Sequence, residues 1–320
     1  MSLPRINNTL LNDLFKIQLG FGTWQWGDKF VWGYGREDYT DDDIKAAFDT
    51  AIQAGIQFFD TAEIYGLGKS ERFIGAFIPQ TDQPVFVATK YMPFPWRTLF
   101  LPKRAFFDAL RNSLKRLGIS TIPLYQIHWP NPLAKSATLL AYMAEAVDRG
   151  LIQQVGVSNF NTAQVLDAHK TLSHLNIPLA SNQIKYNLLD RQAEFNGLME
   201  VCKDLGVRVI AYSPLAQGFL SGKYTPERMP STYRYRRLST WQRSRFPDMV
   251  RELRLVGDKY EGKSPAQVAI NWTIMKGTLP IPGVKNSSQV LSCLGALGWR
   301  LTPEDLLRLD EISALSARDQ

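Results

Sequence analysis

An alternation of short apolar segments with longer amphipathic ones restricts the possible folds of this chain more than any other feature. The short segments are rich in β-branched and aromatic residues, and the longer ones carry apolar residues at helical spacing. We predict strands over 18–21, 56–60, 85–90, 123–128, 154–158, 180–184, 207–212 and 279–282. We predict helices over 41–54, 70–78, 103–117, 135–149, 162–174, 192–205, 265–276, 287–296 and 303–314. Such an alternation predicts a parallel sheet closed into a (β/α)8 barrel, the TIM-barrel fold class.

Residues at the ends of the predicted helices support these boundaries. Thr40 precedes three aspartates, whose carboxylates suit the positive end of a helix. Ser70 is expected to cap the helix that follows Gly68-Lys69. The alternative fold is an open, doubly wound sheet, in which G-x-G-x-x-G would join a strand to a helix. The nearest match, GFGTW at 20–24, lacks the third glycine, so the closed barrel is favoured.

Composition indicates one folded domain over residues 1–320. Apolar residues make up 45% of the chain, which is enough for a large core, and we find no linker or low-complexity tract. Barrels of this class often reach such a length as one unit. The only cysteines, Cys202 and Cys293, favour a cytoplasmic location and, with three histidines, give little material for a metal site. We expect neither a secretory signal nor membrane insertion, because no apolar run approaches the roughly 18 residues of a membrane helix.

The net charge of +7 leaves three interpretations open. It can reflect a solvated basic surface, attraction of phosphate-bearing ligands, or binding of nucleic acid. Residues 228–254 hold eight arginines interleaved with aromatic residues, a mixture that can mark a nucleic-acid surface. We favour a long loop after the seventh strand that covers phosphates of a ligand, and nucleic acid is the less favoured reading.

Four polar residues stand at or just after the predicted carboxyl ends of strands, where active sites of such barrels lie. Asp60 ends the second strand in FFDTAEIYG, Lys90 the third in VATKY, and His128 the fourth in QIHWP. Tyr65 follows Asp60 in the next loop. Each has an ordinary structural explanation when taken alone, such as a turn former or a surface cation. Their shared position favours one reactive cluster.

The chemistry of this cluster fits the reduction of a carbonyl group. Hydride transfer to the carbonyl carbon builds negative charge on the oxygen, and a proton donor must neutralise it. Tyrosine, with a pKa near 10, is a weak acid at neutral pH, and an adjacent ammonium lowers that pKa. We therefore expect Tyr65 to donate the proton, Lys90 and Asp60 to tune it, and His128 to orient the carbonyl. General acid catalysis of this kind is worth about 10²–10⁴-fold in rate.

Several motifs in a fixed order resemble the aldo-keto reductase superfamily over nearly the whole chain. They are GFGTW (20–24), FFDTAEIYG (58–66), TK (89–90), HWP (128–130), GVSNF (156–160), NQIKYN (182–187), AYSPLAQGFLSGKY (211–224) and IPGVKNSSQV (281–290). The seventh motif resembles the branch of potassium-channel β subunits and pyridoxal reductases. The stretch WGDKFVWGYG (26–35) is similar to plastid and cyanobacterial members.

The resemblance implies a catalytic tetrad of Asp60, Tyr65, Lys90 and His128, with NADP(H) as the cofactor. Ser158, Asn159 and Gln183 match residues that bind the nicotinamide carboxamide, and Tyr212 matches the aromatic residue that stacks on the ring. The residues matching the pyrophosphate loop are Ser213, Pro214, Leu215, Gln217, Gly218 and Lys223, within a long cofactor-covering loop around 218–247. Further expected contacts come from Gly22, Thr23, Trp24, Pro282 and Gly283, from Gln289 on the adenine side, and from Arg234 and Lys285 near the 2′-phosphate.

The expected substrate is a small carbonyl compound, bound in a pocket that includes Trp24, Tyr65, His128 and Trp129. Trp26 and Trp32 belong either to this pocket or to a packed hairpin. The chain departs from its branch where glutamate and asparagine often follow the adenine-side glutamine, since it has Ser292 and Cys293 there. A redox-sensing subunit that binds NADP(H) with very slow turnover is the alternative function. The sequence does not identify the carbonyl compound or the oligomeric state.

Overall fold

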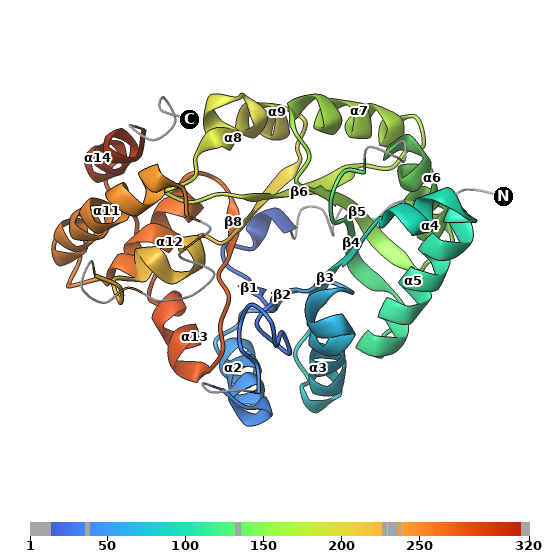
Figure 1. Cartoon of the computed structure of the whole chain (residues 1–320), viewed down its shortest axis with the longest axis horizontal. Helices are drawn as coiled ribbons and strands as arrows, with labels where there is room; N and C mark the ends of the chain where they lie inside the picture. Colours follow the sequence, from blue (N-terminus) through green and yellow to red (C-terminus); the bar gives the residue numbers. More distant parts are fainter. Residues whose placement is uncertain are drawn as a thin grey trace.

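Eight parallel strands form one sheet whose first and last strands meet, which confirms the predicted (β/α)8 barrel (Figure 1). The computed structural model describes residues 14–35, 39–131, 136–225, 229, 236 and 238–314. The strands are β1 Phe21–Gly22, β2 Phe58–Asp60, β3 Phe86–Tyr91, β4 Ile122–Ile127, β5 Ile152–Ser158, β6 Leu179–Lys185, β7 Arg208–Tyr212 and β8 Leu279–Ile281. A bridge between Gly22 and Gly283 closes the barrel. Gly22 permits this close approach, because a Cβ there would lie 3.1 Å from the Ile281 carbonyl oxygen.

Helices surround the sheet and follow the strands in chain order (Figure 1). They are α2 Asp41–Gln53, α3 Lys69–Phe77, α4 Pro95–Leu99, α5 Pro102–Leu117, α6 Ser136–Asp148, α7 Thr162–Ser173, α8 Gln192–Phe195, α9 Leu198–Asp204, α11 Thr240–Asp258, α12 Pro265–Met275, α13 Ser287–Leu294 and α14 Pro303–Ala314. Short 3-10 helices are η1 Tyr65–Gly68, η2 Ile78–Gln80 and η3 Ala216–Ser221. In the described residues, no helix is both long and apolar enough to cross a membrane.

One expected helix start is confirmed, a second is wrong, and one expected helix is divided in two. Thr40 caps α2 as predicted, in a reciprocal capping box with Asp43. The prediction that Ser70 caps α3 is wrong, because the cap is Gly68 and Ser70 lies inside the first turn. The single helix expected over 192–205 is two helices, α8 and α9. Gly197 separates them with a left-handed φ of 77°.

Helix α11 corrects the interpretation of the arginine-rich segment. The loop expected through residue 254 is wrong from Thr240 onward, where a helix begins behind a capping box of Ser239 and Gln242. Its inward face buries Phe246 in the core, and Trp241 packs against the same core. These two rings are therefore not a free platform for stacked bases. Arg234 and the rest of 230–235 lie outside the described residues, so the cofactor-covering role of this stretch stays a prediction.

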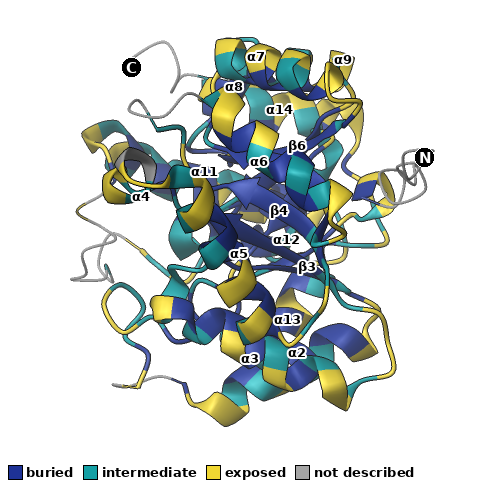
Figure 2. Ribbon diagram, turned by 90° about the vertical axis from the view of Figure 1, so that its right-hand side faces the viewer, coloured by how far each residue is buried: buried dark blue, intermediate teal, exposed yellow. Residues whose placement is uncertain are grey.

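Side chains along each strand point alternately into the barrel and out toward the helices, so the core has an inner and an outer part. Successive side chains of a strand point to opposite faces. Phe58 therefore belongs to a small cluster inside the barrel, whereas Phe59 packs in the large cluster between sheet and helices. Figure 2 shows the buried strands between helices whose outer faces are exposed. Asp60 shares the inner face with Phe58, so its carboxylate points into the carboxyl-terminal mouth of the barrel.

Candidate active site

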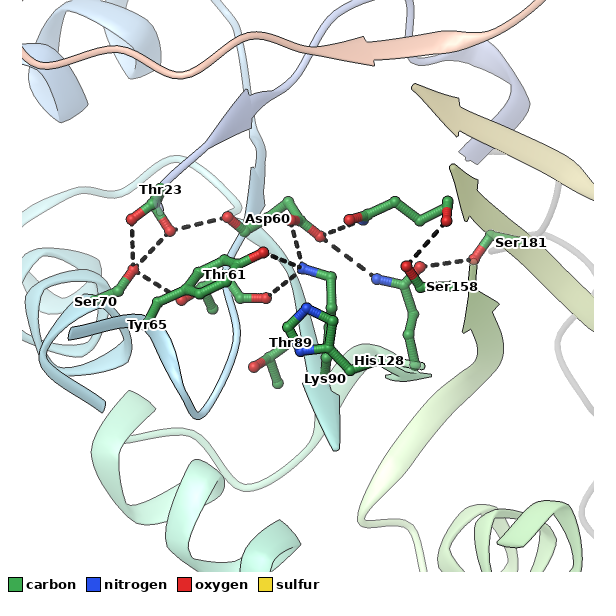
Figure 3. A network of polar contacts seen from close by, with 12 residues as sticks. Thr23, Asp60, Thr61, Tyr65, Ser70, Thr89, Lys90, His128, Ser158 and Ser181 are labelled. Carbon is green, nitrogen blue, oxygen red and sulfur yellow. Dashed lines mark hydrogen bonds and ion pairs between the residues drawn. The ribbon is translucent and has the colours of Figure 1, made fainter. Parts of the chain in front are cut away.

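The structure brings the four predicted residues together at the mouth of the barrel, as Figure 3 shows. Asp60 is the last residue of β2, and Lys90 lies near the end of β3. His128 follows β4 directly, and Tyr65 opens η1 in the loop after β2. Parallel strands end at the same rim, so residues far apart in sequence share this volume.

A buried ion pair forms the base of the cluster. Lys90 Nζ lies 2.6 Å from Asp60 Oδ1, with the Lys90 side chain fully buried and that of Asp60 3% exposed. Lys90 Nζ also donates to the Thr61 carbonyl oxygen at 2.7 Å. Gln183 Nε2 donates to the other Asp60 oxygen at 2.7 Å. Burial raises the pKa of Asp60 and lowers the pKa of Lys90, although each partner's charge opposes the other's shift.

Tyr65 lies beside this pair with its hydroxyl at the lysine. Its OH is 3.5 Å from Lys90 Nζ, and Trp24 stacks on its ring with centroids 6.0 Å apart. The expectation that Lys90 lowers the pKa of Tyr65 is wrong, because burial raises this pKa well above 10 and Asp60 adds to the shift. The hydroxyl therefore carries its proton throughout the neutral pH range.

His128 faces the same volume as a neutral ring. Its ring lies edge-on to Tyr65 with centroids 5.7 Å apart. Burial, with a smaller contribution from Lys90, lowers the pKa of His128 well below 6.5. Within the described residues, the buried Nδ1 has no hydrogen-bond partner. Asn159 Nδ2 donates to the His128 carbonyl oxygen at 3.0 Å and so ties the histidine to the loop after β5.

His128 should make the protein more stable at pH 7 than at pH 5. An unfolded histidine binds a proton below its ordinary pKa of about 6.5, whereas the buried ring stays neutral to lower pH. The unfolded state thus binds more protons in this window, and the free energy of unfolding rises with pH through it. Urea unfolding at both pH values measures this slope, and His128→Gln should make it shallower. An equal slope in the variant would contradict the assignment.

The residues expected at the nicotinamide lie next to one another on neighbouring strands. Ser158 and Gln183 are partners in the register of β5 and β6, and Ser158 Oγ donates to the Gln183 carbonyl oxygen at 2.9 Å. Asn159 Nδ2 donates to Ser158 Oγ at 3.0 Å, and Tyr212 OH donates to Asn159 Oδ1 at 2.9 Å. They form one polar wall beside the four-residue cluster.

Left-handed backbone is concentrated along this wall. Asn159 has a φ of 61°, Ser213 of 54°, Ala216 of 47° and Gln217 of 58°. Such conformations cost about 1–3 kcal/mol each in residues other than glycine and cluster at ligand-binding sites. The turns curl the segment after β7 around the rim. This shape suits a loop that wraps a pyrophosphate, so the cofactor expected from the sequence fits the residues present.

A second group of expected cofactor residues lies where the barrel closes. Gly22 and Gly283 form the closing bridge, and Thr23 follows with its hydroxyl bonded to the Asp60 carbonyl oxygen at 2.9 Å. Lys285 stands before α13, where its Nζ donates to the Trp32 carbonyl oxygen at 3.3 Å. Gln289 Oε1 accepts from the Lys285 backbone N–H at 2.9 Å.

Tryptophans separate into pocket and core. Trp24 flanks Tyr65, Trp32 meets Trp24 edge-on at 5.7 Å, and Trp129 is 47% exposed next to His128. Trp26 is fully buried and donates its Nε1–H to the Val284 carbonyl oxygen at 2.8 Å. Trp26 is therefore a core residue, and the reading that placed it in the pocket is wrong.

The sequence reasoning missed a polar layer beneath the cluster. Gln126 of β4 is fully buried, with Nε2 3.4 Å from Asp60 Oδ2. Ser70 is also fully buried and bonds to both Thr23 and Thr61 (Figure 3). One signal was available for Gln126: it stands two residues before His128 and thus on the same face of the strand.

Metal-binding side chains are not gathered in the described part of the barrel. The described residues contain no group of three or more histidine, cysteine, aspartate or glutamate side chains that could hold a metal ion. Cys202 and Cys293 are both buried and unpaired with each other. Burial raises the pKa of the Cys293 thiol to about 12.

Comparison with known proteins agrees with the arrangement of the candidate active site. The chain is 39% identical over 308 residues to a chloroplastic pyridoxal reductase of Arabidopsis thaliana, covering 91% of this chain and 82% of that protein. It is 29% identical over 299 residues to a Schizosaccharomyces pombe protein provisionally named a voltage-gated potassium channel subunit beta, covering 87% and 86%.

A solved structure and a family model complete the comparison. The structure is an aldo/keto reductase from Klebsiella pneumoniae in complex with NADP and acetate. It is 26% identical with a TM-score of 0.72, and the match covers 92% of this chain and 91% of that one. The model of the Aldo/keto reductase family matches residues 18–314. The chain belongs to the aldo/keto reductase family of oxidoreductases.

Proposed function

We propose that the protein reduces an aldehyde or ketone to the alcohol with NADPH, and that Tyr65 supplies the proton. One observation carries the proposal: a protonated phenol, a buried Lys90–Asp60 pair and a neutral His128 face one volume at the mouth of the barrel. The net reaction is R–CHO + NADPH + H⁺ giving R–CH₂OH + NADP⁺. When bound, the nicotinamide supplies the hydride.

The polar wall would hold that cofactor against the cluster. Ser158, Asn159 and Gln183 present amide and hydroxyl groups suited to a carboxamide, and Tyr212 presents a ring at the end of β7. The turn from Ser213 through Gly218, with Lys223 after it, suits the pyrophosphate. The relative from Klebsiella pneumoniae, which was solved with NADP, supports the choice of cofactor.

His128 and Tyr65 would act on the carbonyl oxygen together. A neutral imidazole N–H can donate to the carbonyl without competing for the proton, which polarises the carbonyl and fixes its direction. As negative charge develops, the oxygen approaches an alkoxide, which is a stronger base than an ordinary phenolate. The Tyr65 hydroxyl would therefore give its proton to that oxygen. Lys90 then stabilises the phenolate that forms.

A turnover screen tests the proposal. NADPH oxidation is followed over about 30 carbonyl compounds that include pyridoxal, aryl aldehydes, sugars and methylglyoxal-type dicarbonyls. The pyridoxal reductase relative puts pyridoxal first in the panel. Rapid oxidation with at least one compound supports a reductase. Tight NADPH binding with negligible turnover across the panel would favour the redox-sensing alternative.

Lys285→Ala should weaken NADPH binding about tenfold or more and leave NADH binding within about twofold. The 2′-phosphate is a dianion, and one charge-assisted hydrogen bond is worth about 1.5–3 kcal/mol. Lys285 stands directly before the N-terminus of α13, where backbone N–H groups also favour an anion. Titration of both cofactors measures the ratio, and Lys170→Ala on the exposed face of α7 is the matched control. Equal losses for the two cofactors would argue against the role.

The place of this protein in the cell is also open to a simple test. We propose a cytoplasmic location from the cysteine content, whereas the Arabidopsis thaliana relative is named as chloroplastic. Fractionation of the source cells, with detection by an antibody, would separate the two. Recovery in a membrane-bound organelle would overturn the proposed location.

A further inference from the structure

A polar cavity lies at the amino-terminal base of the barrel, at the opposite end from the candidate active site. It has a volume of about 260 Å³. Its wall includes Arg208 at the start of β7, Thr278 before β8, and Trp299 and Arg300 after α13. β7 runs from Arg208 at this end to Tyr212 at the mouth, a separation of roughly 13 Å at strand rise. A liquid-like share of about 30 Å³ per water makes the cavity large enough for a small organic molecule.

Arg208 gives this cavity an unusual electrostatic character. The residue is 8% exposed, and none of the ion pairs among the described residues includes it. Its Nη atoms donate to carbonyl oxygens, those of Gly277 at 2.8 Å, Ile17 at 3.0 Å and Thr278 at 3.3 Å. Burial lowers its pKa to about 10, so the guanidinium is still charged at neutral pH. A buried charge is normally paired with an opposite one.

Carbonyl contacts alone leave Arg208 incompletely satisfied. A guanidinium has five N–H donors, and the three contacts leave Nε without a partner among the described residues. Arg300, exposed at the rim of the same cavity, adds a second positive charge. The described residues of the lining include both arginines and no aspartate or glutamate. The field inside the cavity therefore favours an anion.

The other residues that line the cavity indicate that the anion also has an apolar part. Ile274 and Met275 at the end of α12 and the Trp299 ring provide apolar surface next to the arginines. Phe15 covers Arg208, with the guanidinium carbon 5.4 Å from the ring centroid. An inorganic ion would leave this apolar surface uncovered. A molecule with a carboxylate or phosphate at one end and an apolar body would use both parts.

We propose that the base cavity binds a small organic anion, with its charged group against Arg208 and Arg300 and its apolar part on Ile274 and Trp299. The site is separate from the mouth of the barrel and does not depend on the proposed reductase activity. Bound there, the ligand would link α12, the entrance to β8 and the connection between α13 and α14. Its binding should therefore stabilise the folded barrel.

Benzoate is the first probe, and its uncharged counterpart benzamide is the control. The protein is saturated with NADP⁺, so that the phosphate-binding part of the cofactor site is filled. Crystals soaked with 4-bromobenzoate should show the bromine anomalous signal in the base cavity. Calorimetric titration should give benzoate binding at least tenfold tighter than benzamide binding. Signal only at the mouth of the barrel, or equal binding of the two probes, would overturn the proposal.

Two variants locate the binding in solution. Arg300→Glu reverses a charge at an exposed position, and it should weaken benzoate binding at least tenfold while carbonyl turnover stays within about twofold of wild type. Arg208→Met should have the larger effect, and Arg300→Glu carries the test if Arg208→Met does not fold. Unchanged benzoate affinity in Arg300→Glu would contradict the site. If the base-cavity proposal is wrong, benzoate binding fails these tests while carbonyl turnover is unaffected. If the proposed reductase function is wrong, the carbonyl screen shows no turnover.

Discussion

Tyr65→Phe should lower the turnover number for carbonyl reduction by about 10²–10⁴-fold, the range that a positioned general acid contributes. The substitution removes one oxygen and keeps the ring that stacks on Trp24. NADPH affinity should therefore stay within about twofold of wild type. Steady-state NADPH oxidation with the best substrate of the screen gives the turnover, and quenching of tryptophan fluorescence gives the affinity. A drop in affinity as large as the drop in turnover would point to a collapsed pocket instead.

Tyr91→Phe is the matched control for this variant. Tyr91 is the neighbour of Lys90 on β3, but its ring packs in the outer core against Phe106, 5.2 Å away between centroids. Its buried hydroxyl has no hydrogen-bond partner within the described residues. The same loss of one oxygen should therefore leave turnover at the wild-type level. Wild-type turnover in Tyr65→Phe, or an equal loss in Tyr91→Phe, would remove Tyr65 from the mechanism.

The sequence predicted the barrel and most of the cluster because both depend on local patterns. Strands of a parallel barrel are largely apolar on both faces, so Asp60, Lys90 and His128 stood out as polar residues that close apolar runs. The eight strands follow from the same pattern, with boundaries shifted by up to three residues. The grouping of three distant residues then follows from topology alone.

What the sequence did not predict depends on partners that are distant along the chain. Helix α11 was missed because its many arginines and Pro247 obscure, in the sequence, the helical spacing of the apolar residues on its buried face. The pKa of Tyr65 was predicted in the wrong direction because burial raises it and the nearby Asp60 carboxylate adds to the rise. Predicting helix α11 and the pKa of Tyr65 correctly would have required knowing which distant residues pack against each of them.

The buried pair should be as important for stability as for turnover. Removing one partner of a buried ion pair costs about 3–5 kcal/mol, because the other charge is left buried without compensation. Lys90→Met should accordingly lower the free energy of unfolding by this amount and abolish measurable turnover. Urea unfolding at pH 7 measures the first effect, and NADPH oxidation measures the second. Lys45→Met, which breaks the partly exposed Lys45–Asp49 pair of α2, should cost at most about 1 kcal/mol.

The double variant Asp60→Asn/Lys90→Met separates charge from geometry. It leaves neither member of the pair as an unpaired buried charge, so it should recover at least half of the stability lost in Lys90→Met, while turnover stays absent. The pH dependence gives an independent check. Without Lys90, burial raises the pKa of Asp60 further above its unfolded value, so the folded state binds the proton more tightly. The stability deficit of Lys90→Met should then shrink as the pH falls from 7 toward 4. A deficit that the second substitution does not relieve, and that is constant with pH, would show that Lys90 acts by packing and not by charge.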